Sequence, residues 1–360
     1  MRILFASTQG AGHFGPLVPF IEACRRAGHE VLVVGPPTLD PRGYPFRAGA
    51  RPPEEVLGPL WGRIPRLPPA QGEVIVVGTI FARLNVQAML PTLRETIEEW
   101  RPDVVLREPS EFASATAADE LGVRHLRVAT GLSLVEEGSV ALASQALEDL
   151  RPGLTRRIAE SAYVTCFPAS LDPAPDSVRR FRDPAADTPA GPLPDWWTGD
   201  DRPLVYVTFG SVASEFPPAA AVYQQALEAV SGLPVRALLT VGLRSEVDLG
   251  EVPSNVHVEP WVPQADVLSH AALVVGHGGS GTTLGALSAG VPLVLVPLFA
   301  DQPQNATRVA VAGAGLAVSV DDIRAGIERV LEHDSYRASA RRVADDMRAL
   351  SPVDDFVRDL

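Results

Sequence analysis

A histidine within a glycine-rich turn is the first candidate for chemistry in this chain. His13 lies in the run GAGHFG, residues 10–15, directly after the apolar segment Arg2–Ser7. These letters match the G-x-G-x-x-G pattern of a dinucleotide-binding turn, which also needs an acidic residue at the end of the second strand. The second predicted strand, Glu30–Val34, is followed by Gly-Pro-Pro and has no carboxylate at its end. The pattern therefore disfavours nicotinamide binding at this turn.

The alternative interpretation gives the histidine itself a role. Pro16 follows the run and suits the first turn of a helix, so His13 is expected near a helix N-terminus at the end of the first strand. That position favours the neutral imidazole, which can act as a general base. Spacing alone leaves open a histidine that caps the loop and has no chemistry.

A second glycine-rich turn predicts an anion site. The run VGHGGSGTT, residues 275–283, places a buried strand directly before a helix start, where free N–H groups and the helix dipole attract an anion. Ser280, Thr282 and His277 add side-chain donors. The turn lacks the lysine of a Walker loop, and the sequence has no Asp-x-Asp pair. We therefore expect a diphosphate held by protein donors, with no metal site.

Residues near this turn follow the ends of other predicted strands. Trp261 could stack on a nucleobase, a contact worth about 1–3 kcal/mol per base, or be a core or hinge tryptophan. Asp301 and Gln302 offer acceptors and donors for sugar hydroxyls, or they cap a loop.

Alternating strand and helix patterns predict an α/β fold with two doubly wound parallel-sheet domains that face a central cleft. The predicted domains are 1–180 and 203–345, joined by a linker at 181–202. A helical tail, 346–360, could pack back on the first domain. Predicted strands of the first half are Arg2–Ser7, Glu30–Val34, Val74–Val77, Asp103–Leu106, His125–Ala129 and Ala162–Cys166. Those of the second half are Leu204–Phe209, Ala237–Val241, Val256–Glu259, Leu273–Val275 and Leu293–Val296.

Composition limits the environment and the partners. The 360 residues carry a formal net charge of −13, which disfavours a nucleic-acid partner. The two cysteines have no metal-ligand spacing and suit a reducing compartment. No leader pattern and no apolar stretch long enough to span a bilayer is apparent. We therefore expect a cytoplasmic protein without stable membrane insertion, and the oligomeric state stays open, with a homodimer as one option.

Two segments resemble one known family. WVPQ, HGGSGTTLGALSAGVP and PLFADQ, within 261–302, resemble the nucleotide-diphosphate-sugar signature of the GT-B, family 1 glycosyltransferases. GAGHFGPLVPF, at 10–20, resembles the N-terminal Gly-His-x-x-Pro region of the same family. The likeness extends over nearly the whole chain. It is similar to the bacterial branch that glycosylates antibiotics and other natural products.

The resemblance implies a role for each matching position. His13 would be the general base, paired with Glu108 where the family usually has aspartate, or else with Glu111. A pocket formed by loops at 57–83 and 130–145 would bind the acceptor through Phe81, Leu84 and Met89. The donor-binding residues implied by the family pattern are Ser211, Trp261, Val262, Gln264, His277, Gly279, Ser280, Gly281, Thr282, Asp301 and Gln302.

The implied activity is an inverting, metal-independent transfer of a sugar or deoxysugar to a small hydrophobic natural-product acceptor. The co-substrate is a dTDP- or UDP-sugar, and no cofactor is expected. Gly285 stands where UDP-sugar users of the plant branch have a ribose-gripping glutamate, which favours dTDP. Two alternatives remain at this stage: a sugar-nucleotide epimerase on the same fold, and a non-catalytic glycosyltransferase-like auxiliary protein.

Overall fold

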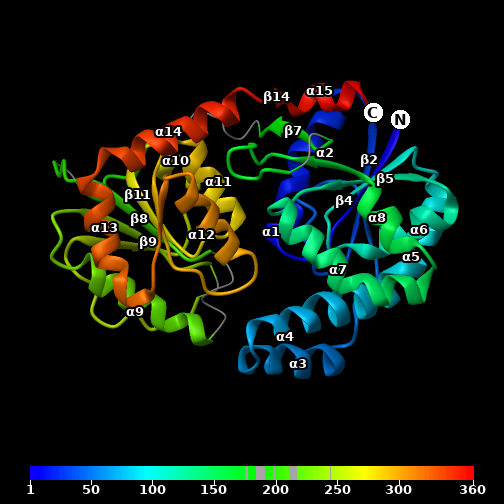
Figure 1. The fold of residues 1–360 in the computed structure, drawn as a ribbon, viewed down its shortest axis with the longest axis horizontal. Coiled ribbons are helices and arrows are strands. Elements are labelled where there is room, and N and C mark those ends of the chain that lie inside the picture. The colour runs from blue at the N-terminus through cyan, green and yellow to red at the C-terminus, as the bar shows by residue number, and fades with distance from the viewer. Residues whose placement is uncertain (175–176, 184–190, 198, 211–216, 244) are drawn as a thin grey trace. The chain divides into compact units, whose positions relative to one another are not determined.

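Two parallel β-sheets organise the chain in the computed structural model, each with helices on both faces (Figure 1). The structure describes residues 1–360 apart from 175–176, 184–190, 198, 211–216 and 244. The chain divides into two units. The first comprises Met1–Cys166, Ala174–Asp183 and Ser351–Leu360, and the second comprises Phe167–Pro173 and Pro184–Leu350. The predicted α/β class with two Rossmann-like parallel-sheet domains is confirmed.

The first unit has a parallel sheet of order β14-β7-β6-β5-β4-β1-β2-β3. Helices α2 and α15 cover one face, and α5 to α8 cover the other (Figure 1). The strands are β1 (Arg2–Ala6), β2 (Glu30–Gly35), β3 (Phe46–Ala48), β4 (Val104–Arg107), β5 (Arg124–Val128), β6 (Ala162–Thr165), β7 (Arg179–Arg182) and β14 (Ser351–Pro352). The helices are α1 (Ala11–Phe14), α2 (Val18–Arg26), α3 (Glu54–Arg63), α4 (Pro69–Glu73), the π-helical segment η3 (Val74–Asn85), α5 (Val86–Trp100), α6 (Phe112–Leu121), α7 (Ser133–Leu150), α8 (Leu154–Glu160) and α15 (Val353–Arg358).

The end of the chain belongs to this first unit. Phe356 of α15 packs edge-on against Phe20 of α2 and Phe181 of β7, with ring centroids 5.2 and 5.4 Å apart. Arg26 also pairs with Asp354 at 2.8 Å. Such edge-to-face aromatic contacts add to the stabilisation from buried area, so α15 completes the core on the α2 side of the sheet.

The second unit has a parallel sheet of order β10-β9-β8-β11-β12-β13. Helices α9 and α13 pack on one face and α10, α11, α12 and α14 on the other. The strands are β8 (Leu204–Thr208), β9 (Arg236–Thr240), β10 (Val256–Glu259), β11 (Ala271–Gly276), β12 (Leu293–Leu295) and β13 (Gly315–Ala317). The helices are α9 (Pro217–Val230), α10 (Gln264–Leu268), α11 (Ser280–Ser288), α12 (Gln302–Val311), α13 (Ile323–Glu332) and α14 (Asp334–Arg348).

In each sheet the strand order reverses beside the strand that comes first in the sequence. β1 lies between β2 and β4, and β8 lies between β9 and β11. Open α/β sheets bind ligands beyond the carboxyl ends of the strands at this point. His13 and Glu108 follow β1 and β4, and His277 follows β11, so the topology places the predicted site residues where such sheets bind ligands.

One predicted strand is wrong, and with it the statement about membrane spans. Val74–Val77 begins the π-helical segment η3, within a helical stretch that runs from Pro69 to Trp100. A short apolar run of β-branched residues cannot be told from a helix by periodicity alone. By length and composition this one stretch could cross a membrane, contrary to the expectation that none could, although core helices of soluble proteins meet the same criterion.

The two segments expected to be acceptor loops are also helical. Residues 57–83 lie mostly in α3, α4 and η3, and 130–145 lie mostly in α7. Even Pro59 lies inside a helix, α3. The two segments that were expected to form acceptor loops are therefore largely helical.

Candidate active site

His13 is presented by a sharp turn after β1. Gly10 has φ of 105°, which favours glycine, and it is the N-terminal cap of α1. Pro16 then begins the next turn, Gly15–Leu17, which leads into α2. His13 is the third residue of α1, and its side chain keeps 31% of its surface exposed. The glycine-rich stretch therefore bends the backbone so that an imidazole reaches solvent beside the sheet.

Glu108 meets this imidazole from the neighbouring strand. β1 and β4 pair in parallel with Ala6 opposite Arg107, and Glu108 follows directly. Its Oε2 lies 3.1 Å from Nδ1 of His13, and its side chain is fully buried. A carboxylate at Nδ1 favours the tautomer with the proton on that nitrogen. Nε2 is then the nitrogen that can accept a proton.

The Glu108 carboxyl is held in its charged form by its surroundings. Oε1 accepts hydrogen bonds from the Thr8 amide at 3.2 Å and the Thr8 hydroxyl at 2.8 Å, and Oε2 accepts one from the Ser110 amide at 2.7 Å. Burial alone would raise the pKa of Glu108. The attraction of His13 and these hydrogen bonds outweigh burial, so the pKa lies below its usual value. The site therefore contains a buried, ionised carboxylate against a histidine.

Glu111, the alternative partner, is used elsewhere. Its Oε2 accepts a hydrogen bond from the Ser114 amide at 2.8 Å and caps the start of α6. Burial raises the pKa of this carboxyl, in contrast to Glu108. The structure thus places Glu108, and not Glu111, beside His13.

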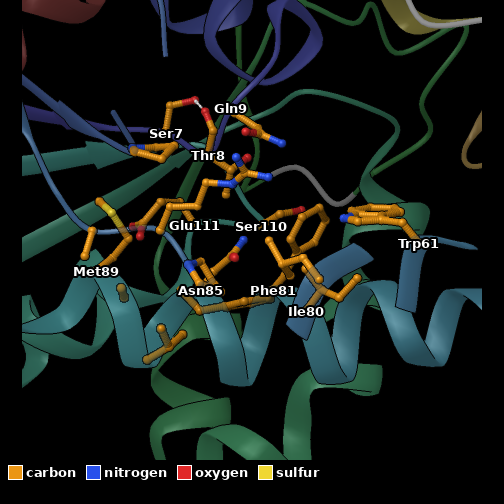
Figure 2. A pocket seen from close by; sticks show the side chains of 18 residues that line it. Ser7, Thr8, Gln9, Trp61, Ile80, Phe81, Asn85, Met89, Ser110 and Glu111 are labelled. Atoms are coloured by element: carbon orange, nitrogen blue, oxygen red, sulfur yellow. Dashed lines mark hydrogen bonds between the residues drawn. The ribbon is translucent and has the colours of Figure 1, made fainter. Parts of the chain in front are cut away.

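A pocket opens beside this pair in the first unit (Figure 2). Ser7, Thr8 and Gln9 form one wall, and the side chains of η3 and α5 lie opposite (Figure 2). Thr8 and Ser110, which hold Glu108, both line the pocket. Its apolar lining residues are Pro36, Ala50, Pro52, Leu57, Trp61, Ile80, Phe81, Val86, Met89, Phe112 and Ala113, and its polar ones are Ser7, Thr8, Gln9, Arg51, Asn85, Ser110 and Glu111.

Two of the three predicted acceptor residues lie in this pocket. Phe81 and Met89 line it, whereas Leu84 is half-buried and does not. The Phe81 ring also meets the His13 ring edge-on, with centroids 5.8 Å apart. The polar residue Asn85, one helical turn from Phe81, was not predicted. Its signal is the i, i+4 spacing, which is visible only once residues 74–85 are known to be helical.

The glycine turn after β11 holds His277 between two backbones. A side chain at Gly279 would lie 2.5 Å from Nε2 of His277, and one at Gly210 would lie 2.9 Å from Cε1. Burial lowers the pKa of His277 to about 4, and the charge of Asp301 opposes this only in part. His277 is therefore neutral at neutral pH. Within the described residues its Nδ1 makes no hydrogen bond.

A polar network fixes the start of α11. Ser280 donates to Oδ2 of Asp301 at 2.7 Å. Asn305 of α12 donates to the Gly278 carbonyl at 2.8 Å, to Asp301 at 2.8 Å and to the Ser280 hydroxyl at 3.1 Å. Asn305 was missed from the sequence, although it stands four residues after Asp301 on one helical face. The network brings the glycine turn and the segment after β12 together.

The other predicted donor-binding residues have distinct surroundings. Gln264 donates to the Thr282 hydroxyl at 3.2 Å, and Trp261 is 59% exposed. Gln302 is buried, and its Oε1 accepts from the amides of Leu298 and Phe299. Gln302 therefore orders its own loop through that oxygen. Val262 is half-buried, Gly281 is exposed, and Ser211 lies outside the described residues.

Comparison with known proteins identifies the family of this chain. Residues 72–200 and 224–360 match the N-terminal and C-terminal domain models described as erythromycin biosynthesis protein CIII-like. The L-demethylnoviosyl transferase of Streptomyces niveus is 33% identical, with 96% of this chain and 94% of that protein covered. The elloramycin glycosyltransferase ElmGT of Streptomyces olivaceus is 32% identical, with 99% and 96% covered. The crystal structure of the glycosyltransferase SnogD from Streptomyces nogalater has a TM-score of 0.77 at 25% identity, with 100% and 98% covered.

Two Rossmann-like domains with these glycine turns define a glycosyltransferase of the GT-B fold. The chain belongs to the family 1 glycosyltransferases, in the bacterial natural-product branch.

Proposed function

We propose that this glycosyltransferase moves a sugar from a dTDP-sugar to a hydroxyl of a hydrophobic natural product, with inversion and without a metal ion. The observation that carries the proposal is the His13–Glu108 pair beside a pocket with a mostly apolar lining. A base that is already oriented by a buried carboxylate and lies next to a largely apolar pocket suits deprotonation of an acceptor hydroxyl.

The proposed reaction is a single displacement. Nε2 of His13 takes the acceptor proton as the acceptor oxygen bonds to the anomeric carbon. The bond from that carbon to the diphosphate oxygen breaks, and its electron pair leaves with the diphosphate. Attack from the face opposite the leaving group inverts the anomeric configuration. Glu108 stabilises the imidazolium that forms.

In the proposed reaction the leaving diphosphate binds at the start of α11 in the second unit. The N–H groups at the start of α11 and the positive end of its dipole favour developing negative charge. Thr282, whose hydroxyl accepts from Gln264, adds an O–H group, and neutral His277 adds a ring nitrogen. This donor set is the basis for proposing that no metal is needed.

The preference for dTDP rests on Gly285. A Cβ at this position would lie 3.1 Å from Oε1 of Gln264 and 3.3 Å from Leu268. A glutamate that grips ribose hydroxyls could be accommodated here only if Gln264 moved. The chain thus lacks a carboxylate at this position that would accept a hydrogen bond from a ribose 2′-hydroxyl.

The test is turnover with dTDP- and UDP-linked forms of one sugar, an aromatic polyol acceptor and NMR assignment of the product anomer. We expect a higher kcat/KM for the dTDP form and an inverted glycoside. A preference for the UDP form would overturn the donor proposal, and a retained configuration would overturn the mechanism. Nucleotide-sugar interconversion without acceptor would instead identify an epimerase.

A further inference from the structure

A buried arginine holds the turn that carries Glu108. Arg107 ends β4 and has no exposed surface. Its Nη1 donates to the carbonyls of Glu108 at 3.2 Å, Pro109 at 3.0 Å and Glu111 at 3.4 Å. Among the described residues, its Nε and Nη2 make no hydrogen bond. The hydrogen bonding of this guanidinium is therefore directed at one short backbone segment.

That segment fixes the hydrogen bonds of the carboxylate. The Ser110 amide, which donates to Oε2 of Glu108 at 2.7 Å, lies inside the turn that Nη1 of Arg107 contacts on both sides. The Glu111 amide donates to the Glu108 carbonyl at 3.2 Å and closes the same turn. If the turn relaxed, Oε2 would lose the Ser110 amide and its placement against His13.

Burying an arginine at this position costs free energy, because its charged guanidinium loses contact with water. The rest of β4 is Val-Val-Leu, fully buried. Burial, followed by the charge of Arg127, lowers the pKa of Arg107 to about 10, while Glu111, Glu108 and Glu136 oppose this. The side chain is therefore still charged at neutral pH. Buried ionic groups can often be replaced by apolar residues without loss of stability, so stability alone does not explain this arginine.

We propose that Arg107 is a positioning residue for the reaction: its contacts with the 108–111 turn hold the Glu108 carboxylate against His13. The proposal rests on the proposed function, in which this pair activates the acceptor. The contacts of Arg107 are with the turn that carries Glu108, so the role proposed for it is exerted through Glu108.

The neighbouring strand supplies a matched control. Arg127 lies directly opposite Arg107 in the β4–β5 register and is also buried, 6% exposed. Its Nη2 donates to the carbonyls of Ala159 and Ser161 at the end of α8, at 2.8 and 3.1 Å. His125, on the same strand, lies close enough for both arginines to lower its pKa, to about 3, in addition to the larger effect of burial. Arg127 is thus the register partner of Arg107 and is also buried, but its hydrogen bonds hold a different turn.

The experiment compares Arg107→Met, Arg107→Lys and Arg127→Met in the full chain. Steady-state kinetics give kcat and KM, and ¹³C-carboxyl NMR, assigned with Glu108→Gln, gives the titration midpoint of Glu108. For Arg107→Met we expect kcat to fall roughly 10- to 100-fold, with KM unchanged and the Glu108 midpoint moved to higher pH. Arg107→Lys keeps a cation with three donors, so we expect partial recovery of both. Arg127→Met should match wild type in both readouts.

Each outcome decides the proposal. Wild-type kcat and Glu108 midpoint in Arg107→Met would overturn it, as would an equal loss in Arg127→Met, which would show a general effect of removing a buried arginine. If Arg107→Met does not fold, Arg107→Lys carries the test, and a wild-type kcat and midpoint there would overturn the proposal. If wild type transfers no sugar, the proposed function fails, but the Glu108 titration still reports whether Arg107 holds the carboxylate.

Discussion

Nδ1 of His13 and Oε2 of Glu108 lie 3.1 Å apart, with the imidazole partly exposed and the carboxylate fully buried. The two residues come from adjacent parallel strands at the point where the strand order of the first sheet reverses. The buried partner fixes the orientation of the ring through Nδ1. The fold itself orients the imidazole, and in the proposed reaction this reduces the reorganisation needed in the transition state.

The first prediction is that activity depends on the length of the Glu108 side chain. Aspartate at this position would draw the carboxylate back by about one C–C bond, roughly 1.5 Å, and a 1 Å misplacement can cost about 100-fold in rate. We expect Glu108→Asp to lower kcat 10- to 100-fold. Glu108→Gln should lower kcat by up to roughly 10⁴-fold, by analogy with the loss of the triad aspartate. Wild-type kcat in Glu108→Asp would contradict the assignment; Glu111→Gln, which removes the other acid, serves as the comparison.

Removing the imidazole should separate chemistry from binding. We expect His13→Ala to lower kcat roughly 10²- to 10⁴-fold, the usual contribution of a general base. Nucleotide binding should persist, because the glycine turn belongs to the second unit. Thermal shifts with dTDP report that binding, since a ligand raises the unfolding temperature in proportion to the logarithm of its concentration over Kd. Near-normal turnover in this variant would show that another group takes the proton.

The network around Asn305 predicts a defect in donor binding. Its amide bridges the Gly278 carbonyl, Asp301 and Ser280. Asn305→Ala removes the side-chain donor to the Gly278 carbonyl and one of the two donors to Asp301, a loss of about 1–3 kcal/mol, so we expect the donor KM to rise about tenfold. Thr307→Ala, on an exposed position of the same helix, is the matched control. If both variants leave the donor KM unchanged, the turn does not depend on Asn305.

Chelation tests the proposed metal independence. Because N–H groups and the helix dipole of α11 can stabilise the leaving diphosphate, we expect full activity after dialysis against EDTA. Loss of activity that is restored by a divalent cation would contradict this expectation.

Sequence patterns predicted those candidate site residues whose positions depend on local structure. His13 and Glu108 follow neighbouring parallel strands of the first sheet, whose carboxyl ends lie together, and the turn at 277–282 follows β11 of the second sheet. Asn305 and Arg107 were not predicted, because each acts on backbone atoms whose positions only the tertiary fold determines. Phe81 and Met89 line the pocket beside Thr8 and Ser110, but they lie on helical segments and not on the loops expected. Their functional roles stay predictions.

Glu136 predicts a pH dependence of stability. It is buried, and its Oε1 accepts hydrogen bonds from the amides of Thr130 and Gly131, at 2.8 and 3.1 Å. Burial raises the pKa of Glu136 from 4.5 to about 7. Between these values the unfolded chain loses the proton while the folded chain keeps it, so the free energy of unfolding falls as pH rises. At about 1.4 kcal/mol per pKa unit, the loss is on the order of 3 kcal/mol.

Glutamine at this position stays neutral and keeps an oxygen for the two amides. We therefore expect Glu136→Gln to raise the free energy of unfolding relative to wild type at pH 8, with the gain disappearing towards pH 4.5. Urea denaturation at several pH values measures it. A gain of equal size at both ends of the range would show that the glutamine acts by packing, and no gain at pH 8 would show that the carboxylate is compensated in the folded state. Glu137→Gln, at the adjacent exposed position of α7, is the control, because an exposed carboxyl should show no such dependence.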